Sequence, residues 1–299
     1  MNDSKEASFN LGVTRFVYFA LVFYLVGVER YFLDWQNVPT EFWLPTGPLL
    51  AFDRPPLSIE VHTWLFYFWR WSLPACALGV GYRVLAPLNF IAGFILMNYA
   101  HSFGYQTHTY MPVLLVGLTL SFSAASDVLS LDSILFRKWL KPSNDVRLYA
   151  LPLRIAQLTF CLVFFSAGIS KLRAGGVEWF TTDTLRNYFL LSSILYEDIN
   201  AVAHQFRLNH ALYSIPWLCH VLAFLTITLE LSAPLAFFKR RAAWIIVPAL
   251  FFAQVFIFFT IFVNFRIYLA AYAAWVNWRW LVDLFRDFVR GALRRRANA

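Results

Sequence analysis

A lysine lies where a long apolar segment ends, and its type and place suit proton chemistry. The segment Phe164–Trp179 reads FFSAGISKLRAGGVEW, so Lys171 is followed by two glycines and a tryptophan. At helical spacing the residues before the lysine form one narrow stripe, in which all but one residue are polar or small: Gly168, Phe164, Cys161, Gln157 and Arg154. A partly desolvated amine loses part of its preference for the charged form and can act as a base. Lys171 is therefore a candidate base, and the alternative is an interfacial lysine that reaches the lipid headgroups.

Two histidines mark the ends of neighbouring apolar segments. His101 follows one segment, and His108 begins the next within the polar sequence QTHTY. Histidine changes charge near neutral pH and is the residue most often used for proton transfer. The alternative for both is a hydrogen-bonded residue at the membrane interface. No third side chain has convincing metal-ligand spacing, so no metal site is predicted.

A carboxylate lies inside another apolar segment. Glu230 shares one helix face with His220 at steps of three and four residues. A charged side chain in the membrane interior is costly and is normally paired or functional, and Arg154 is the predicted partner of Glu230. Because its expected depth is toward the cytoplasm, we assign Glu230 to polar packing between helices rather than to catalysis. Gln157 and Gln254 are assigned the same structural role.

These residues belong to a chain with the composition of an integral membrane protein. It is 60% hydrophobic and only 14% charged, whereas soluble domains carry about 25% charged residues. The sequence predicts an all-α, eight-helix transmembrane bundle over residues 11–285, with tails at 1–10 and 286–299. The expected spans are 11–33, 62–81, 85–100, 108–126, 149–172, 214–238, 243–263 and 267–284. Short interfacial helices are expected within 181–206, and the three cysteines are expected to be buried packing residues.

The basic residues predict an orientation. They cluster after the second, fourth, sixth and eighth apolar segments, so both termini are expected to be cytoplasmic in a bacterial inner membrane. The net charge of +8 is explained by this pattern, and no nucleic-acid partner is predicted. The outer face then holds Lys171, His108, His101, Trp179 and Arg266. In the loop after the fourth segment, Asp132 is expected to cap a helix over residues 134–140.

Three motifs together resemble the transmembrane domain shared by bacterial horizontally transferred transmembrane (HTTM) proteins and vitamin K-dependent γ-glutamyl carboxylase. The segment Ala167–Leu172, followed by Trp179, is similar to the carboxylase run A-G-x-K-K-L with its tryptophan. Thr107–Tyr110 resembles N-H-S-Y, and Leu129–Asp132 resembles W-S-V-D. The order and spacing agree, and the resemblance extends over residues 10–285.

The resemblance implies roles for two residues. Lys171 corresponds to the lysine that deprotonates vitamin K hydroquinone, and His108 to the histidine that assists at the carbanion and carboxylation step. Ser170 stands where the family has a second lysine, and Thr107 where it has asparagine. The implied cofactor is a reduced, vitamin K-like quinone, which can reach Lys171 sideways through the bilayer.

The expected function is a membrane enzyme of this carboxylase-like superfamily that begins by abstracting a proton from a quinol or another lipid-soluble substrate. Candidate substrate-binding residues are His101, Tyr110, Trp179 and Arg266. Two alternatives stay open. One is a non-catalytic membrane subunit that anchors or matures a partner protein or peptide. The other is a small transporter, in which Glu230, His220 and Arg154 form a buried polar path.

Overall fold

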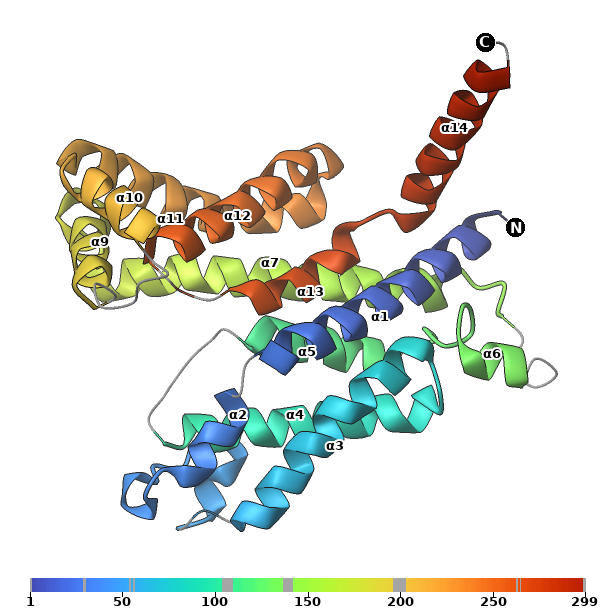
Figure 1. Ribbon diagram of the computed structural model, residues 1–299, viewed down its shortest axis with the longest axis horizontal. Coiled ribbons are helices and arrows are strands. Elements are labelled where there is room, and N and C mark those ends of the chain that lie inside the picture. The colour runs from blue at the N-terminus through green and yellow to red at the C-terminus, as the bar shows by residue number, and fades with distance from the viewer. Residues whose placement is uncertain are drawn as a thin grey trace. The chain divides into compact units, whose positions relative to one another are not determined.

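The computed structural model describes residues 2–28, 31–53, 55, 57–103, 110–136, 142–195, 203–261, 263 and 265–297 (Figure 1). Within these ranges every regular element is a helix, which confirms the all-α prediction. Five helices in this part of the chain are long and apolar enough to cross a membrane: Asp3–Leu25, Tyr82–His101, Arg147–Gly175, Pro216–Phe238 and Arg240–Ile261. These helices are consistent with a multi-pass membrane protein.

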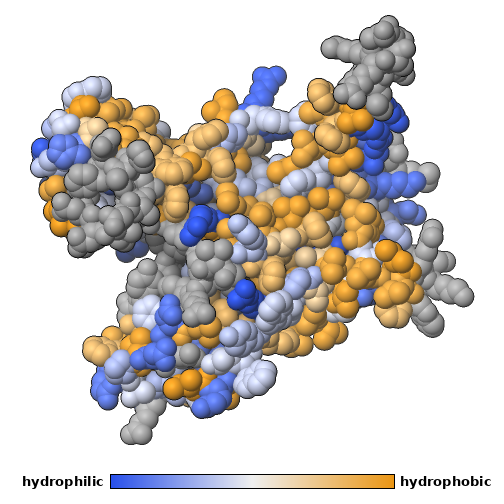
Figure 2. Space-filling model, viewed as in Figure 1, coloured by the Kyte–Doolittle hydropathy of each residue, from blue (hydrophilic) through white to orange (hydrophobic). Residues whose placement is uncertain are grey.

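The helices group into two compact units, Met1–Ala156 with Ile267–Ala299 and Gln157–Arg266. The prediction of one transmembrane domain over 11–285 therefore covers both units. In Figure 2 apolar side chains cover much of the visible surface. Large apolar side chains such as Tyr24, Ile245 and Phe252 are exposed to the surroundings. Lipid is the medium in which such a surface is stable.

The first unit is built on four helices, α1 (Asn2–Val28), α3 (Ile59–Leu78), α4 (Tyr82–His101) and α5 (Met111–Ser121). Helix α1 packs on α3, α3 on α4, and α4 on α5. Helix α3 starts where the Ser58 hydroxyl accepts a hydrogen bond from the Val61 N–H and ends at Gly79, whose φ is +70°. A Cβ at Gly79 would overlap Ser130 and Arg15, so only glycine fits this turn.

Smaller elements complete this unit: α2 (Tyr31–Asp34), three short 3₁₀ helices at Trp35–Asn37, Thr40–Phe42 and Gly47–Ala51, and α6 (Leu131–Leu135). The segment before α3 forms an apolar cluster with the end of α4, in which Trp43, Leu49, Tyr99 and Phe103 are buried. The N-terminal residues predicted as a polar tail are already helical, because α1 begins at Asn2.

Three predicted spans differ from the structure. The span 62–81 corresponds to α3, which is not among the five helices that are long and apolar enough to cross a membrane. The span 108–126 contains only the 11-residue helix α5, about 16 Å long against a hydrocarbon core of about 30 Å. The span 267–284 is wrong as a single helix. It consists of a 3₁₀ turn Arg266–Tyr268, α13 (Leu269–Tyr272), a 3₁₀ turn Ala273–Trp275, a break, and then α14 (Trp278–Ala297).

The physical reason is burial in protein rather than in lipid. Ile267, Tyr268, Ala270, Ala271, Ala273 and Ala274 are all buried. Helix α13 packs on α1 and α5. Irregular backbone at membrane depth is tolerated where protein surrounds it. Hydropathy alone does not distinguish such a segment from a spanning helix, because both are uniformly apolar.

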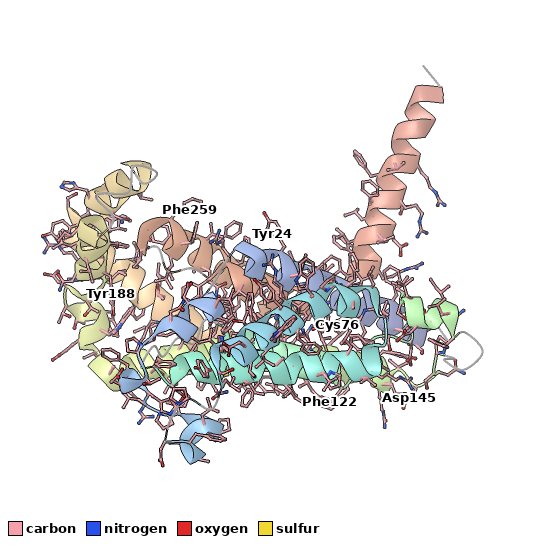
Figure 3. All side chains as sticks on the ribbon, turned by 60° about the horizontal axis from the view of Figure 1, so that its bottom comes forward. Tyr24, Cys76, Phe122, Asp145, Tyr188 and Phe259 are labelled. Atoms are coloured by element: carbon pink, nitrogen blue, oxygen red, sulfur yellow. The ribbon has the colours of Figure 1, made fainter. Side chains whose placement is uncertain are left out.

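The second unit contains the end of α7 (Arg147–Gly175) and then α8 (Glu178–Thr181), α9 (Thr184–Leu195), α10 (Ala203–Tyr213), α11 (Pro216–Phe238) and α12 (Arg240–Ile261). Helices α11 and α12 pack on each other, as do α9 and α10. The short helices expected within 181–206 are therefore present as α9 and the start of α10. All three cysteines are buried, as predicted. Figure 3 shows Cys76 within the first unit, whereas Tyr24 and Phe122 lie on its surface.

Candidate functional site

The second unit contains a direct ion pair between two helices. The Lys171 Nζ on α7 lies 2.6 Å from both carboxylate oxygens of Glu230 on α11. The lysine side chain is 26% exposed and the glutamate side chain 11%. The structure thus pairs Glu230 with Lys171, where the sequence suggested Arg154. It also corrects the expected depths, because two atoms at hydrogen-bond distance lie at the same level of the membrane.

A glycine makes this approach possible. Gly168 precedes Lys171 by one helical turn, and a Cβ there would lie 3.1 Å from Leu231 Cδ2 and 3.2 Å from Glu230 Cβ. Its missing side chain therefore lets α11 come close to α7 beside the lysine. The predicted stripe is buried at Cys161, Phe164 and Gly168. The small-residue pattern in the sequence thus indicated a helix contact correctly.

The tryptophan that follows the lysine returns to it. Helix α7 ends at Gly175, and the chain turns at Gly176, whose φ is +55°. This turn places the Trp179 ring centroid 5.5 Å from the Lys171 Nζ. A cation over an indole face is attracted by the negative face of the ring. The amine consequently lies between a carboxylate and an aromatic face.

His220 belongs to a neighbouring cluster rather than to the lysine. Its Nε2 lies 3.8 Å from Asp183 Oδ1, and the other Asp183 oxygen accepts a hydrogen bond from Arg186 Nη1 at 3.1 Å. The Arg186 Nε also donates to the Tyr213 carbonyl at 3.1 Å. These contacts tie the start of α9 to the loop before α11. His220 thus lies beside Asp183, near the start of α11.

The other predicted site residues lie in different places. His108 lies outside the described residues, so its approach to Lys171 stays a prediction. His101 is the last residue of α4, and Tyr110 is buried just before α5, both in the first unit. The Arg266 guanidinium lies 5.5 Å from the Phe258 ring. Gln254 is buried in α12, Gln157 is half-buried in α7, and Arg154 is on an exposed position of α7.

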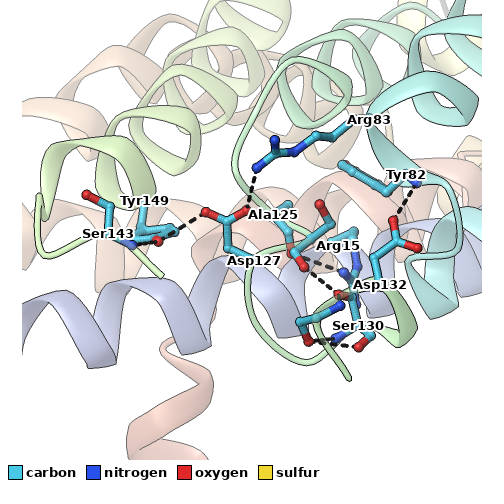
Figure 4. A network of polar contacts seen from close by, with 11 residues as sticks. Arg15, Tyr82, Arg83, Ala125, Asp127, Ser130, Asp132, Ser143 and Tyr149 are labelled. Carbon is cyan, nitrogen blue, oxygen red and sulfur yellow. Dashed lines mark hydrogen bonds and ion pairs between the residues drawn. The ribbon is translucent and has the colours of Figure 1, made fainter. Parts of the chain in front are cut away.

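A second charged network, in the first unit, includes a residue that sequence analysis missed (Figure 4). Arg15 on α1 is fully buried. Its Nη1 donates to the Ala125 carbonyl at 3.0 Å, and its Nη2 donates to the Leu129 carbonyl at 2.5 Å. The signal was available, because an arginine inside an apolar helix is costly and normally has a definite partner.

Asp132 in the same network caps a helix other than the expected one. Its two oxygens accept hydrogen bonds from the backbone N–H groups of Gly81 and Tyr82, at 2.9 and 3.0 Å, at the start of α4. The short helix α6 is capped instead by Ser130, whose hydroxyl accepts from the Ser133 N–H at 2.8 Å. The LSLD motif is therefore a structural junction between α1, α4 and α6 in this chain.

Chemically, the two networks differ in what holds the charges. In the described part of the chain, no group of three His, Cys, Asp or Glu side chains is placed to hold a metal ion. The Lys171–Glu230 pair, in contrast, joins two titratable side chains by direct hydrogen bonds. Such a pair can take up one further proton without coming apart, because an ammonium and a carboxylic acid still form a hydrogen bond.

Comparisons of the chain with protein-family models, with curated proteins and with solved structures found no match.

Proposed function

We propose that the protein is a membrane enzyme that removes a proton from a quinol or another lipid-soluble substrate at the Lys171–Glu230 pair. The observation that carries this proposal is the contact of a partly exposed lysine amine with both oxygens of a buried carboxylate. The motif resemblance supports it, because the same lysine is the one that matches the base of the vitamin K-dependent carboxylase. The reduced quinone is the proposed cofactor, and the cellular site is a bacterial inner membrane with both termini cytoplasmic.

The proton balance of the first step is simple. The quinol O–H bond breaks, and its proton goes to the pair, on Glu230 when Lys171 is already an ammonium. The pair then carries one positive charge, and the substrate oxygen carries one negative charge. The ammonium stabilises this oxyanion strongly, because apolar helices surround the site and screen charges poorly. His108 is the proposed second catalytic residue, which assists at the later carbanion and carboxylation step.

The structural contacts also suggest how a substrate reaches the site. The Lys171 side chain keeps a quarter of its surface exposed, whereas Glu230 is nearly covered. Trp179 provides a flat apolar face beside the amine, on which an aromatic ring can stack. A substrate dissolved in the bilayer can therefore meet the amine first, with Glu230 behind it as the proton acceptor.

One rival is favoured by a specific observation. The lysine and glutamate already satisfy each other within the chain, as a purely structural ion pair does. In that case the protein is a non-catalytic membrane subunit that anchors or matures a partner protein. The two proposals differ in whether the pair can be replaced by apolar side chains without loss of function.

The experiment uses the full-length protein in lipid nanodiscs, with reduced menaquinone as the probe. Dissolved oxygen is the oxidant that accepts the two electrons of the deprotonated quinol, so oxygen uptake and quinol oxidation are followed together. We expect the protein to accelerate both processes. The variants Lys171→Ala, Glu230→Gln and His108→Ala should each remove this acceleration, although each variant is still folded and still shows an unfolding transition. Arg173→Ala is the matched control, because Arg173 is an exposed cation on the same helix. Equal rates in the wild-type protein and all three variants would falsify the proposal.

A further inference from the structure

The last helix, α14 (Trp278–Ala297), has one apolar and one charged face. At helical spacing the apolar face contains Trp278, Leu281, Val282, Phe285, Phe288 and Val289. The opposite face contains Arg279, Asp283, Arg286 and Arg290. Asp283 links this face internally, since its oxygens lie 3.1 Å from both Arg279 Nε and Arg286 Nη2. Sequence and contacts thus define an amphipathic helix rather than a spanning one.

The start of α14 is fixed to the first turns of α1. Asn277 Nδ2 donates to Glu6 Oε1 at 3.2 Å, and the Arg279 N–H donates to Asn10 Oδ1 at 2.9 Å. The Trp278 indole N–H donates to Thr14 Oγ1 at 3.1 Å. The polar beginning of α1 gives way to its apolar part at residue 11. Helix α14 therefore begins at the level where α1 enters the hydrocarbon region.

Beyond this anchor the apolar face is uncovered. Phe285 is 69% exposed and Phe288 is 74% exposed, although they are among the largest apolar side chains of the helix. In Figure 1 α14 runs across the direction of α4 and α5, which belong to its own unit, instead of alongside them. A helix that leaves a bundle sideways at the interface can lie in the plane of the membrane.

The charge of the helix identifies the surface that covers it. Residues 278–297 contain six arginines and two aspartates, which gives a net charge of +4. Phospholipid headgroups with a negative charge attract such segments, while the acyl boundary accepts the phenylalanine side chains. We infer that α14 is an interfacial helix that binds the surface of an anionic membrane, with its apolar face in the acyl boundary and its arginines on phosphate groups.

The test measures the depth of each face in the full-length protein. Val289→Cys and Asp287→Cys place a nitroxide spin label on opposite faces, about 200° apart around the helix. The three native cysteines are buried, so the label goes to the introduced one. In nanodiscs of phosphatidylcholine and phosphatidylglycerol, we expect the label at 289 to collide mainly with oxygen. The label at 287 should collide mainly with a water-soluble nickel chelate.

Four results would overturn the inference. Equal access of the chelate to both labels would mean that α14 lies in water, and oxygen access alone at both would mean that it spans. Dipolar broadening between labels at 289 would mean that a second copy covers the face. In pure phosphatidylcholine the contrast between 289 and 287 should shrink. If it does not, the apolar face alone holds the helix and anionic headgroups are not its ligand.

The charged face has its own control. In the double variant Arg286→Gln/Arg290→Gln, the contrast between the two labels should no longer depend on phosphatidylglycerol. Arg173→Gln, an exposed arginine in the second unit, should leave that dependence intact. A double variant that responds to phosphatidylglycerol as the wild-type helix does would contradict the assignment of these arginines to phosphate groups.

Discussion

The two units of this protein both bury charge, and they satisfy it differently. In the first unit Arg15 bonds to the carbonyls of Ala125 and Leu129, and Asp132 bonds to the N–H groups at the start of α4. Asp127 in the same unit bonds instead to side chains, those of Arg83 and Tyr149. In the second unit Lys171 and Glu230 bond to each other. A backbone group neither titrates nor leaves, so the first arrangement fixes a fold. Two titratable side chains can exchange a proton, so the second permits chemistry.

The two arrangements also differ in whether a substitution can remove both members of the interaction. No side chain change can remove the carbonyls that Arg15 satisfies, whereas both members of the Lys171–Glu230 pair can be exchanged together. A buried ion pair is often replaced by apolar side chains at little cost, while the loss of one member leaves an uncompensated charge.

The largest loss of stability is expected for Arg15→Met. The substitution removes two charge-assisted hydrogen bonds and leaves the buried Ala125 carbonyl and the part-buried Leu129 carbonyl without this donor, which should cost about 3 kcal/mol of unfolding free energy. Unfolding in mixed detergent micelles measures it. Lys5→Met, an exposed change on the same helix, should cost almost nothing. A loss below that of the lysine control would show that Arg15 does not hold the 122–130 loop.

A double-mutant cycle should give the next effect. Lys171→Met and Glu230→Leu should each cost about 2 kcal/mol, and the double variant about 1 kcal/mol, because only the single variants leave a charge without its counter-ion. The same unfolding assay measures all four proteins. Additive losses would mean that the two side chains do not pair. A stable double variant that has lost quinol oxidation would favour the enzyme, and one that keeps its biological activity would favour the structural subunit.

A smaller loss is expected for Asp132→Asn. The amide offers one acceptor oxygen and turns its NH₂ group toward the second backbone N–H, so the cap of α4 is half lost. The expected cost is about 1 kcal/mol, typical of a helix cap. Asp53→Asn, in an exposed loop, is the matched control. An unchanged unfolding midpoint for Asp132→Asn would show that the carboxylate does not hold the α4 terminus.

Much of the fold could be predicted, because length and hydropathy identify membrane-spanning helices in a sequence. The helices α1, α4, α7, α11 and α12 correspond to predicted spans. The eighth span was wrong because Ile267–Ala274 is as apolar as a spanning helix but is covered by protein. Hydropathy reports only the composition of a segment. Whether lipid or protein covers that segment depends on tertiary packing.

The site could be predicted only in part. The stripe through Gly168 indicated the buried face of α7 beside Lys171, and this face follows from helical periodicity. The partner of Lys171 could not be predicted, because the depth of Glu230 was estimated by counting residues along α11. That count assumes that all helices are straight, parallel and aligned at their ends. Arg15 could have been recognised as a buried charge from its place in an apolar helix, but its partners could not, because backbone carbonyls leave no trace in residue types.

The smallest and most specific effect concerns Gly168, the glycine at the contact between α7 and α11. In a helix interior Gly→Ala gains up to about 1 kcal/mol. At Gly175 a Cβ would make only ordinary contacts, 3.4 Å or longer, with Trp179, so Gly175→Ala should stabilise the protein by about 0.5 kcal/mol. At Gly168 the new Cβ would lie 3.2 Å from Glu230 Cβ, which cannot move without moving α11. Gly168→Ala should therefore destabilise by about 0.5 kcal/mol and weaken the Lys171–Glu230 coupling. Equal stabilisation by both alanines would mean that α7 and α11 do not approach closely at the ion pair.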